Sequence, residues 1–149
     1  MARYEKSIEI DVPVRTAYNQ WTQFEEFPRF MDGVDQVTQI DDARLHWVAN
    51  IAGQRREWYA KITEQIPDKR IEWHGEEGKM HSGMVSFESL DANRTRVTLM
   101  MEYEPEGFAE SIGDALGLLN RQVAGDLGRF KEFIEARGVE TGSWRGTIS

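Results

Sequence analysis

The sequence predicts an α+β fold in which a curved antiparallel sheet of about seven strands wraps around one long C-terminal helix, with two short helices after the first strand. Successive segments alternate apolar and polar residues, as half-buried strands do, and short turns rather than helices join them. The last long segment instead repeats its apolar residues at steps of three and four. A sheet with one apolar face must cover it, and this helix is the one element long enough to do so.

The N-terminal part alternates first and then becomes helical. Residues 4–11 place Ile8 and Ile10 on one side, which predicts the first strand. Pro13 then falls near the first turn of a helix, where its missing N–H costs nothing. A second short helical piece over residues 24–31 ends at a turn signal. Both helices therefore precede the main part of the sheet.

About six further strands follow, with turns rich in Asp, Asn, Gly and Pro between them. The predicted strands span residues 34–40, 44–51, 57–66, 71–73, 80–90 and 95–103. Because turns this short join antiparallel neighbours, the strands should form a meander. Arg55 and Arg56 lie at one of the turns and are expected in solvent.

The long helix is predicted over about residues 108–137. Gly138 is a natural C-cap, so we expect one domain over residues 1–138 and a flexible tail over residues 139–149. Glycines one turn apart near the start of the helix either allow close packing on the sheet or loosen the first turns into a gate. The apolar stripe consists of Ile112, Leu116, Leu119, Val123, Leu127, Phe130 and Ile134.

Composition excludes several classes of protein. The chain contains no cysteine, which rules out disulfides and thiolate metal sites and fits a reducing cytoplasm. No stretch approaches the roughly 18 apolar residues of a membrane helix, and the N-terminus has no apolar signal region. A formal charge of −8 argues against nucleic-acid binding. We therefore expect a cytoplasmic monomer or homodimer with no cofactor, no metal and no nucleic-acid partner.

Several segments together resemble one known family. They are Trp21–Met31 leading into Gly33 and Val34, Trp47, Ile71–Trp73, Gly83–Phe87, Thr95–Val97 and Leu127–Phe133. In this order they resemble the polyketide cyclase/dehydrase branch of the START-like (SRPBCC) superfamily. The resemblance implies the helix-grip fold and a small hydrophobic ligand, since the superfamily includes cyclases, lipid and sterol carriers, quinone-binding proteins, hormone receptors and chaperone activators.

Three tryptophans, Trp47, Trp58 and Trp73, fall one per strand on the parity that carries the aliphatic residues. They are either an unusually aromatic core or the lining of a cavity between sheet and helix. The resemblance favours lining for at least two of the three. The predicted ligand-binding residues are Trp47, Trp58, Trp73, His81, Met101, Tyr103, Leu116 and Leu119.

His81 is the best candidate for chemistry because it shares the inward parity of Val85 and Phe87 and because imidazole titrates near neutral pH. It can act as general acid or base, while Tyr103 hydrogen-bonds a carbonyl or enolate oxygen. Alternatively, His81 is a buried or rim histidine that only orients a ligand. His46 and His74 fall on the outward parity, and the three histidines lack the spacing of a metal site.

Three functions remain open at this point. The chain is a binding protein or carrier for a hydrophobic molecule of polyketide, lipid, sterol or quinone type. It is alternatively a cyclase or dehydratase that uses His81, or a protein-interaction module with a vestigial cavity. No catalytic motif of the family can be transferred to this sequence.

Overall fold

The computed structural model describes residues 2–51, 53–76, 82–103 and 112–148. Within these ranges, the side chains of residues 2–4, 51, 54, 103, 112–120 and 122 are not described. No helix in this part of the chain is long and apolar enough to cross a membrane.

The elements follow the predicted order of one strand, two short helices, six strands and a long helix. They are β1 (Ala2–Ile10), α1 (Val14–Trp21), the 3-10 helix η1 (Phe24–Arg29), β2 (Val34–Asp41), β3 (Arg44–Ile51), β4 (Gln54–Ile66), β5 (Arg70–Gly75), β6 (Ser82–Asp91), β7 (Arg94–Tyr103) and α2 (Ile112–Arg137). The strands form one antiparallel sheet in the order β1-β7-β6-β5-β4-β3-β2. This order confirms the predicted meander, with β1 added beside β7.

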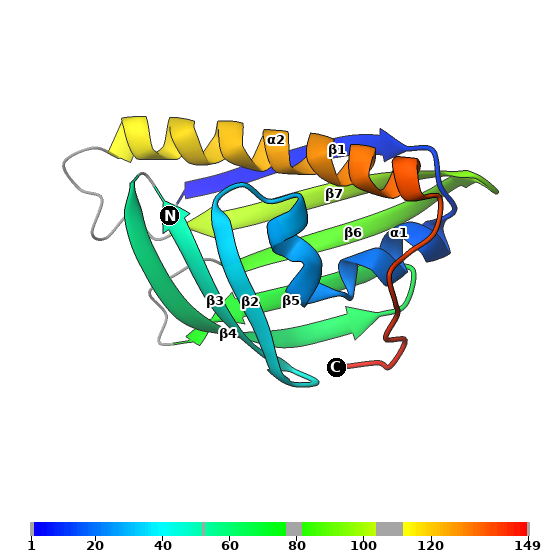
Figure 1. The fold of residues 1–149 in the computed structure, drawn as a ribbon, viewed down its shortest axis with the longest axis horizontal. Helices are drawn as coiled ribbons and strands as arrows, with labels where there is room; N and C mark the ends of the chain where they lie inside the picture. Colours follow the sequence, from blue (N-terminus) through cyan, green and yellow to red (C-terminus); the bar gives the residue numbers. More distant parts are fainter. Residues whose placement is uncertain (1, 52, 77–81, 104–111, 149) are drawn as a thin grey trace.

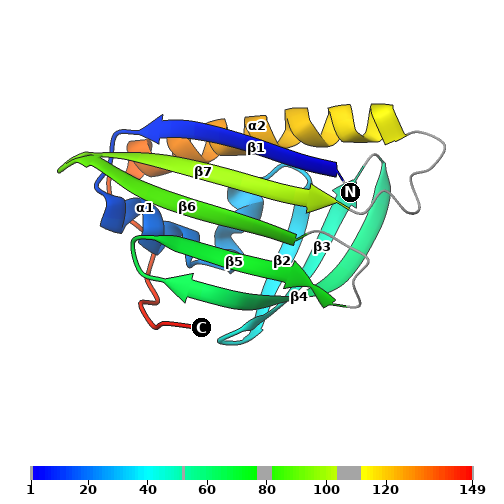
Figure 2. The same ribbon diagram turned by 180° about the vertical axis from the view of Figure 1, so that it is seen from behind.

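All three helices lie on one face of the sheet (Figure 1). The sheet curves toward α2, which runs along β1 and β7, and α1 and η1 fill the rest of this inner face. The view from behind shows the outer face without a covering element (Figure 2). This arrangement is the predicted helix-grip fold.

The inner face is apolar because strand residues alternate sides, and these positions carry aliphatic side chains. One such residue from each of five strands is at most 1% exposed: Leu45, Ile62, Ile71, Val85 and Val97. They form one buried cluster with the apolar stripe of α2, which is confirmed at its described positions, where Leu127, Phe130 and Ile134 are at most 1% exposed. Full burial of each such side chain stabilises the fold by about 1.5–3 kcal/mol.

A cluster of aromatic rings joins the short helices to α2. Trp21 lies at its centre, with ring centroids 5.5 Å from Phe27 and 4.9 Å from Phe130, both edge-to-face. Phe30 packs 5.1 Å from Phe130 on another side. Trp21 is 1% exposed, so this cluster is a closed core.

The C-terminal segment, residues 139–148, returns across α1 to the sheet (Figure 1). Thr141 donates its N–H to the Gln20 side chain at 2.8 Å, and Ile148 forms an antiparallel bridge with Gln65 of β4. Arg145 donates hydrogen bonds to Asn19 at 2.6 Å and to the Asp68 carboxylate at 2.8 Å. The mobility predicted for this segment stays a prediction, but its contacts connect it to two separate elements.

Two of the glycines in α2 have described surroundings. A Cβ built on Gly128 would meet no atom within 4 Å, whereas one on Gly125 would lie 3.0 Å from the Arg129 guanidinium. Neither of these two glycines therefore marks a close contact between α2 and the sheet. The close-packing and gating alternatives for the first turns of α2 concern side chains outside the described part.

Asp126 connects α2 to the turn between η1 and β2. Its carboxylate accepts a hydrogen bond from Arg129 and another from the Asp32 N–H at 3.2 Å, and Arg129 also donates to the Phe30 carbonyl at 3.1 Å. Burial raises the pKa of Asp126 to about 6, against the lowering effect of Arg129. The neutral carboxyl is therefore the form that folding favours.

We expect Asp126→Asn to remove a pH-dependent loss of stability. A carboxyl whose folded pKa is raised adds stability below its unfolded pKa and loses it as pH rises through about 6. The advantage of the asparagine variant over the wild type should therefore grow by roughly 2–3 kcal/mol between about pH 4 and pH 7. Urea unfolding followed by tryptophan fluorescence at several pH values measures it.

Asp32→Asn provides the control, since it changes an exposed carboxylate 3.5 Å from the same Arg129. This variant should leave the pH profile of unfolding close to that of the wild type. A constant difference between Asp126→Asn and wild type across the same pH range would contradict the prediction.

Candidate functional site

Trp47, Trp58, Trp73 and Met101, here called the inner wall, lie on the inner face of the sheet on β3, β4, β5 and β7. Trp47 and Trp73 are each 8% exposed, and Trp58 and Met101 are partly buried against the core. The paired strands β6 and β7 begin and end, respectively, at the end of the sheet where α2 begins (Figure 1). The inward parity predicted for the three tryptophans is confirmed.

Trp47 and Trp58 form the first half of the inner wall. They are paired directly across β3 and β4, and their rings stack in parallel with centroids 5.8 Å apart and an interplanar angle of 4°. The ring of Phe27 from η1 lies 5.6 Å from Trp47. Because Trp47 is fixed between a strand partner and a helix, its orientation is set before any ligand arrives.

Trp73 and Met101 form the second half and meet over Gly83 of β6. In the strand register, Gly83 is paired with Trp73 on one side and Met101 on the other. A Cβ built on Gly83 would lie 2.5 Å from Cζ2 of Trp73 and 2.9 Å from Sδ of Met101. The missing side chain of Gly83 therefore lets an indole and a thioether approach each other across β6.

The indole N–H of Trp47 is the least satisfied polar group on the inner wall. Its Nε1 is buried and has no hydrogen-bond partner among the described residues. Since an indole N–H lies in the plane of the ring, it cannot point at the face of the parallel Trp58 ring. The Nε1 of Trp21 also lacks such a partner, but aromatic rings enclose Trp21 within the closed core.

Arg56 is a residue of this region that the sequence prediction missed. It was expected in solvent at a turn, but β4 begins at Gln54, three residues earlier than predicted, and Arg56 is paired with the inward Ala49. Alternation along β4 places Arg56 on the same face as Trp58, and its Nε is buried. Extending the strand backwards from Trp58 would have identified it.

Four predicted site residues have no described side chain. His81 lies outside the described residues, and Tyr103 is the last residue of β7. Leu116 and Leu119 belong to α2, in its first half. The catalytic role of His81 and Tyr103, and the ligand contacts of all four, stay predictions.

The two other histidines lie on the outer face, as their parity predicted. His46 packs against Tyr59 with ring centroids 4.8 Å apart, and its Nε2 lies 3.4 Å from the Glu57 carboxylate. His74 is hydrogen-bonded to the Ser82 hydroxyl at 3.1 Å. Among the described residues, no three His, Asp or Glu side chains come together in an arrangement that can hold a metal ion.

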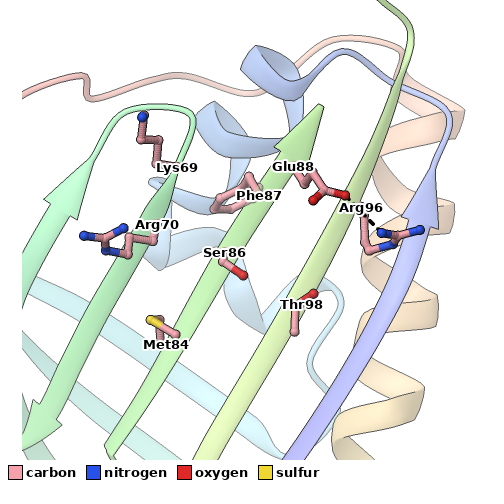
Figure 3. Close-up of a pocket in the computed structure, with 8 residues that line it drawn as sticks. All are labelled: Lys69, Arg70, Met84, Ser86, Phe87, Glu88, Arg96 and Thr98. Atoms are coloured by element: carbon pink, nitrogen blue, oxygen red, sulfur yellow. Dashed lines mark hydrogen bonds and ion pairs between the residues drawn. The ribbon is translucent and has the colours of Figure 1, made fainter. Parts of the chain in front are cut away.

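A depression of about 490 Å³ lies on the outer face, over β5, β6 and β7 (Figure 3). Arg70 is bonded to Glu64, and Arg96 to Glu88 at 3.0 Å, so ion pairs compensate much of its charge. It faces away from the inner wall and is not the cavity predicted between sheet and helix. Its lining residues are Lys69, Arg70, Met84, Ser86, Phe87, Glu88, Arg96 and Thr98.

Gly83→Ala should destabilise the protein by about 1–3 kcal/mol, because the new methyl group would force the Trp73 ring away from β6. Gly128→Ala is the matched control: it meets open space on a helix and should stabilise by up to about 1 kcal/mol. Thermal and urea unfolding of both variants tests the packing. Wild-type stability in Gly83→Ala would show that Trp73 does not lie over this glycine.

Comparison with known proteins shows both family and fold relatives. An uncharacterized 17.2 kDa protein from the melC2–rnhH intergenic region of Streptomyces lincolnensis is 51% identical over 149 residues, which cover 99% of each chain. A crystal structure of a Deinococcus radiodurans protein is 26% identical, with a TM-score of 0.71 over 91% of this chain and 99% of that one. The Zhui aromatase/cyclase from Streptomyces sp. R1128 shares the fold, with a TM-score of 0.76, 15% identity and coverage of 96% and 99%.

The model of the family described as "Polyketide cyclase / dehydrase and lipid transport" matches residues 10–132. These residues run from the end of β1 to the last turns of α2 and so include every element of the inner wall. The protein belongs to the polyketide cyclase/dehydrase and lipid transport family.

Proposed function

We propose that the protein binds a small hydrophobic molecule of polyketide, lipid, sterol or quinone type between the inner wall and α2. The observation that carries this proposal is the buried N–H of Trp47 on an otherwise apolar surface. Small-molecule sites combine apolar and aromatic walls with a few placed polar groups. Trp47, Trp58 and Met101 supply such a surface.

An oxygen atom on the ligand would satisfy the Trp47 N–H. Leaving a buried donor without an acceptor costs about 1–3 kcal/mol, so the pairing favours a ligand that carries a carbonyl or hydroxyl oxygen. The parallel stack with Trp58 leaves the indole edge as the donating side. The site therefore favours an oxygenated molecule over a pure hydrocarbon.

Arg56 extends the polar part of this surface. It follows Trp58 by two residues toward the start of β4, on the same face. A guanidinium group donates up to five hydrogen bonds and suits carboxylate or enolate oxygens. A ligand with an apolar body and an oxygen-rich end would place the body on Trp58 and the oxygen atoms near Arg56.

Trp47→Phe should weaken binding of 1,4-naphthoquinone by roughly 2- to 10-fold, because it removes one hydrogen-bond donor and keeps an aromatic ring. Binding of naphthalene, which has no acceptor oxygen, should change much less in the same variant. Isothermal titration calorimetry with both compounds measures the two effects. Equal loss for both compounds would contradict the role of the N–H.

Trp144→Phe is the matched control, since Trp144 lies in the C-terminal segment and its N–H group on the backbone bonds to Thr22. Its affinity for both compounds should equal that of the wild type. Native mass spectrometry of the purified protein then tests for a retained ligand. If no apolar compound binds or raises the melting temperature, the interaction-module alternative gains and the binding proposal fails.

Catalysis of cyclisation or dehydration is the second candidate function. Arg56 favours it, because a guanidinium on the inner face can stabilise the enolate oxygen that such a reaction generates. In this proposal His81 is the general acid or base and Tyr103 donates a hydrogen bond to the carbonyl oxygen. The family description includes both cyclases and lipid transport proteins.

His81→Ala separates the two functions. Under the catalytic proposal, turnover of a poly-β-ketone substrate should fall by about 100-fold or more, while naphthoquinone affinity stays near the wild-type value. His74→Ala, on the outer face, is the control and should leave turnover intact. Wild-type turnover in His81→Ala, or no turnover by the wild type, would overturn the catalytic proposal and leave the binding proposal standing.

A further inference from the structure

We propose that the protein holds bound water in a polar chamber lined by Tyr18, Gln65 and Asp68 and covered by the C-terminal segment. The chamber lies at the α1 end of the core and is separate from the inner wall. Its three residues come from α1, from β4 and from the turn between β4 and β5. No step of the proposed ligand binding depends on it.

Unsatisfied polar atoms gather at this place. The Tyr18 hydroxyl, both polar atoms of the Gln65 amide and Oδ1 of Asp68 are buried and have no hydrogen-bond partner among the described residues. Tyr18 and Gln65 are at most 1% exposed, so bulk solvent does not reach them. A buried polar atom that bonds to nothing destabilises the folded state, and four of them left unpaired in one place are not expected in a marginally stable domain.

Arg145 shows that these side chains are neighbours. Its guanidinium donates to Oδ2 of Asp68 at 2.8 Å and lies 5.5 Å from the centre of the Tyr18 ring. The pKa of Tyr18 is raised, chiefly by burial. The charge of Asp68 adds to this rise, whereas the Gln65 amide and Arg145 oppose it. Gln65 is thus close enough to act on the Tyr18 hydroxyl, although the two side chains do not reach hydrogen-bond geometry.

The mixture of donors and acceptors selects water. Oδ1 of Asp68 and Oε1 of Gln65 need donors, whereas the Gln65 NH₂ group needs acceptors and the Tyr18 hydroxyl accepts either. A cation would leave the NH₂ group unsatisfied and would be repelled by Arg145. An anion would be repelled by Asp68. Water both donates and accepts, and buried water characteristically bonds two to four such groups.

The C-terminal segment covers the chamber. The backbone of Gln65 exchanges two hydrogen bonds with Ile148, at 2.8 and 3.0 Å. Thr141 and the Gln20 side chain exchange two more, and the Trp144 N–H donates to the Thr22 hydroxyl at 3.1 Å. Because these bonds must open before water can leave, the bound water should exchange slowly with solvent.

Oxygen-17 relaxation dispersion tests the proposal by detecting water that resides longer than the protein takes to tumble. Gln65→Met, which keeps the size of the side chain and removes its amide, should lower the dispersion amplitude relative to the wild type. Gln36→Met changes an exposed residue of β2. It is the matched control and should leave the dispersion unchanged.

A crystal structure that resolves ordered water gives the second test. Density within hydrogen-bonding distance of the Gln65 amide and of the Tyr18 hydroxyl or Asp68 supports the proposal. A direct hydrogen bond between Tyr18 and Gln65 with no water beside them would overturn it. Equal dispersion amplitudes in the wild type and Gln65→Met would overturn it as well, even if Gln65→Met unfolds at a lower temperature.

Discussion

Covering the apolar face of the antiparallel sheet is the constraint on which the rest of this structure depends. In the described part of the chain, all three helices lie on the inner face and none covers the outer face (Figure 2). Leu127, Phe130 and Ile134 of α2 seal one half of that face, and Asp126 fixes the same stretch of helix to the turn after η1. Trp47 and Trp73 of the inner wall belong to the same buried cluster as Trp21, and Trp58 and Met101 pack against that cluster.

The inner face therefore has two regions with different chemistry. Around Trp21 of α1, rings from η1 and α2 pack edge-to-face. Along the inner wall, large rings alternate with very small residues, since Trp73 is paired with Gly83, and Ala49 and Ala60 flank the Trp47–Trp58 pair in the register. Small residues opposite large rings let the rings lie close to the sheet, as the Trp73 ring does over Gly83.

Both ends of the core hold buried polar atoms that have no partner among the described residues, on Tyr18, Gln65 and Asp68 at the α1 end and on Trp47 at the inner wall. At the α1 end, Asn19 and Gln20 are buried, and the C-terminal segment pairs with both of them. On the inner wall, the buried indole N–H of Trp47 has no partner among the described residues. Buried polar groups that the fold itself pairs stabilise the fold, and a buried donor without a partner is costly unless something bonds to it.

The sequence by itself determined the order of elements, the meander and the inward parity of Trp47, Trp58 and Trp73. These features follow from local periodicity and turn residues, which can be read from a short segment without knowing its tertiary contacts. Only the tertiary structure decided that Arg56 faces inward and that Gln65 pairs with Ile148, a residue more than eighty positions away. The first depends on where a strand starts, the least certain feature of any periodic pattern, and the second on a long-range contact that leaves no local signal.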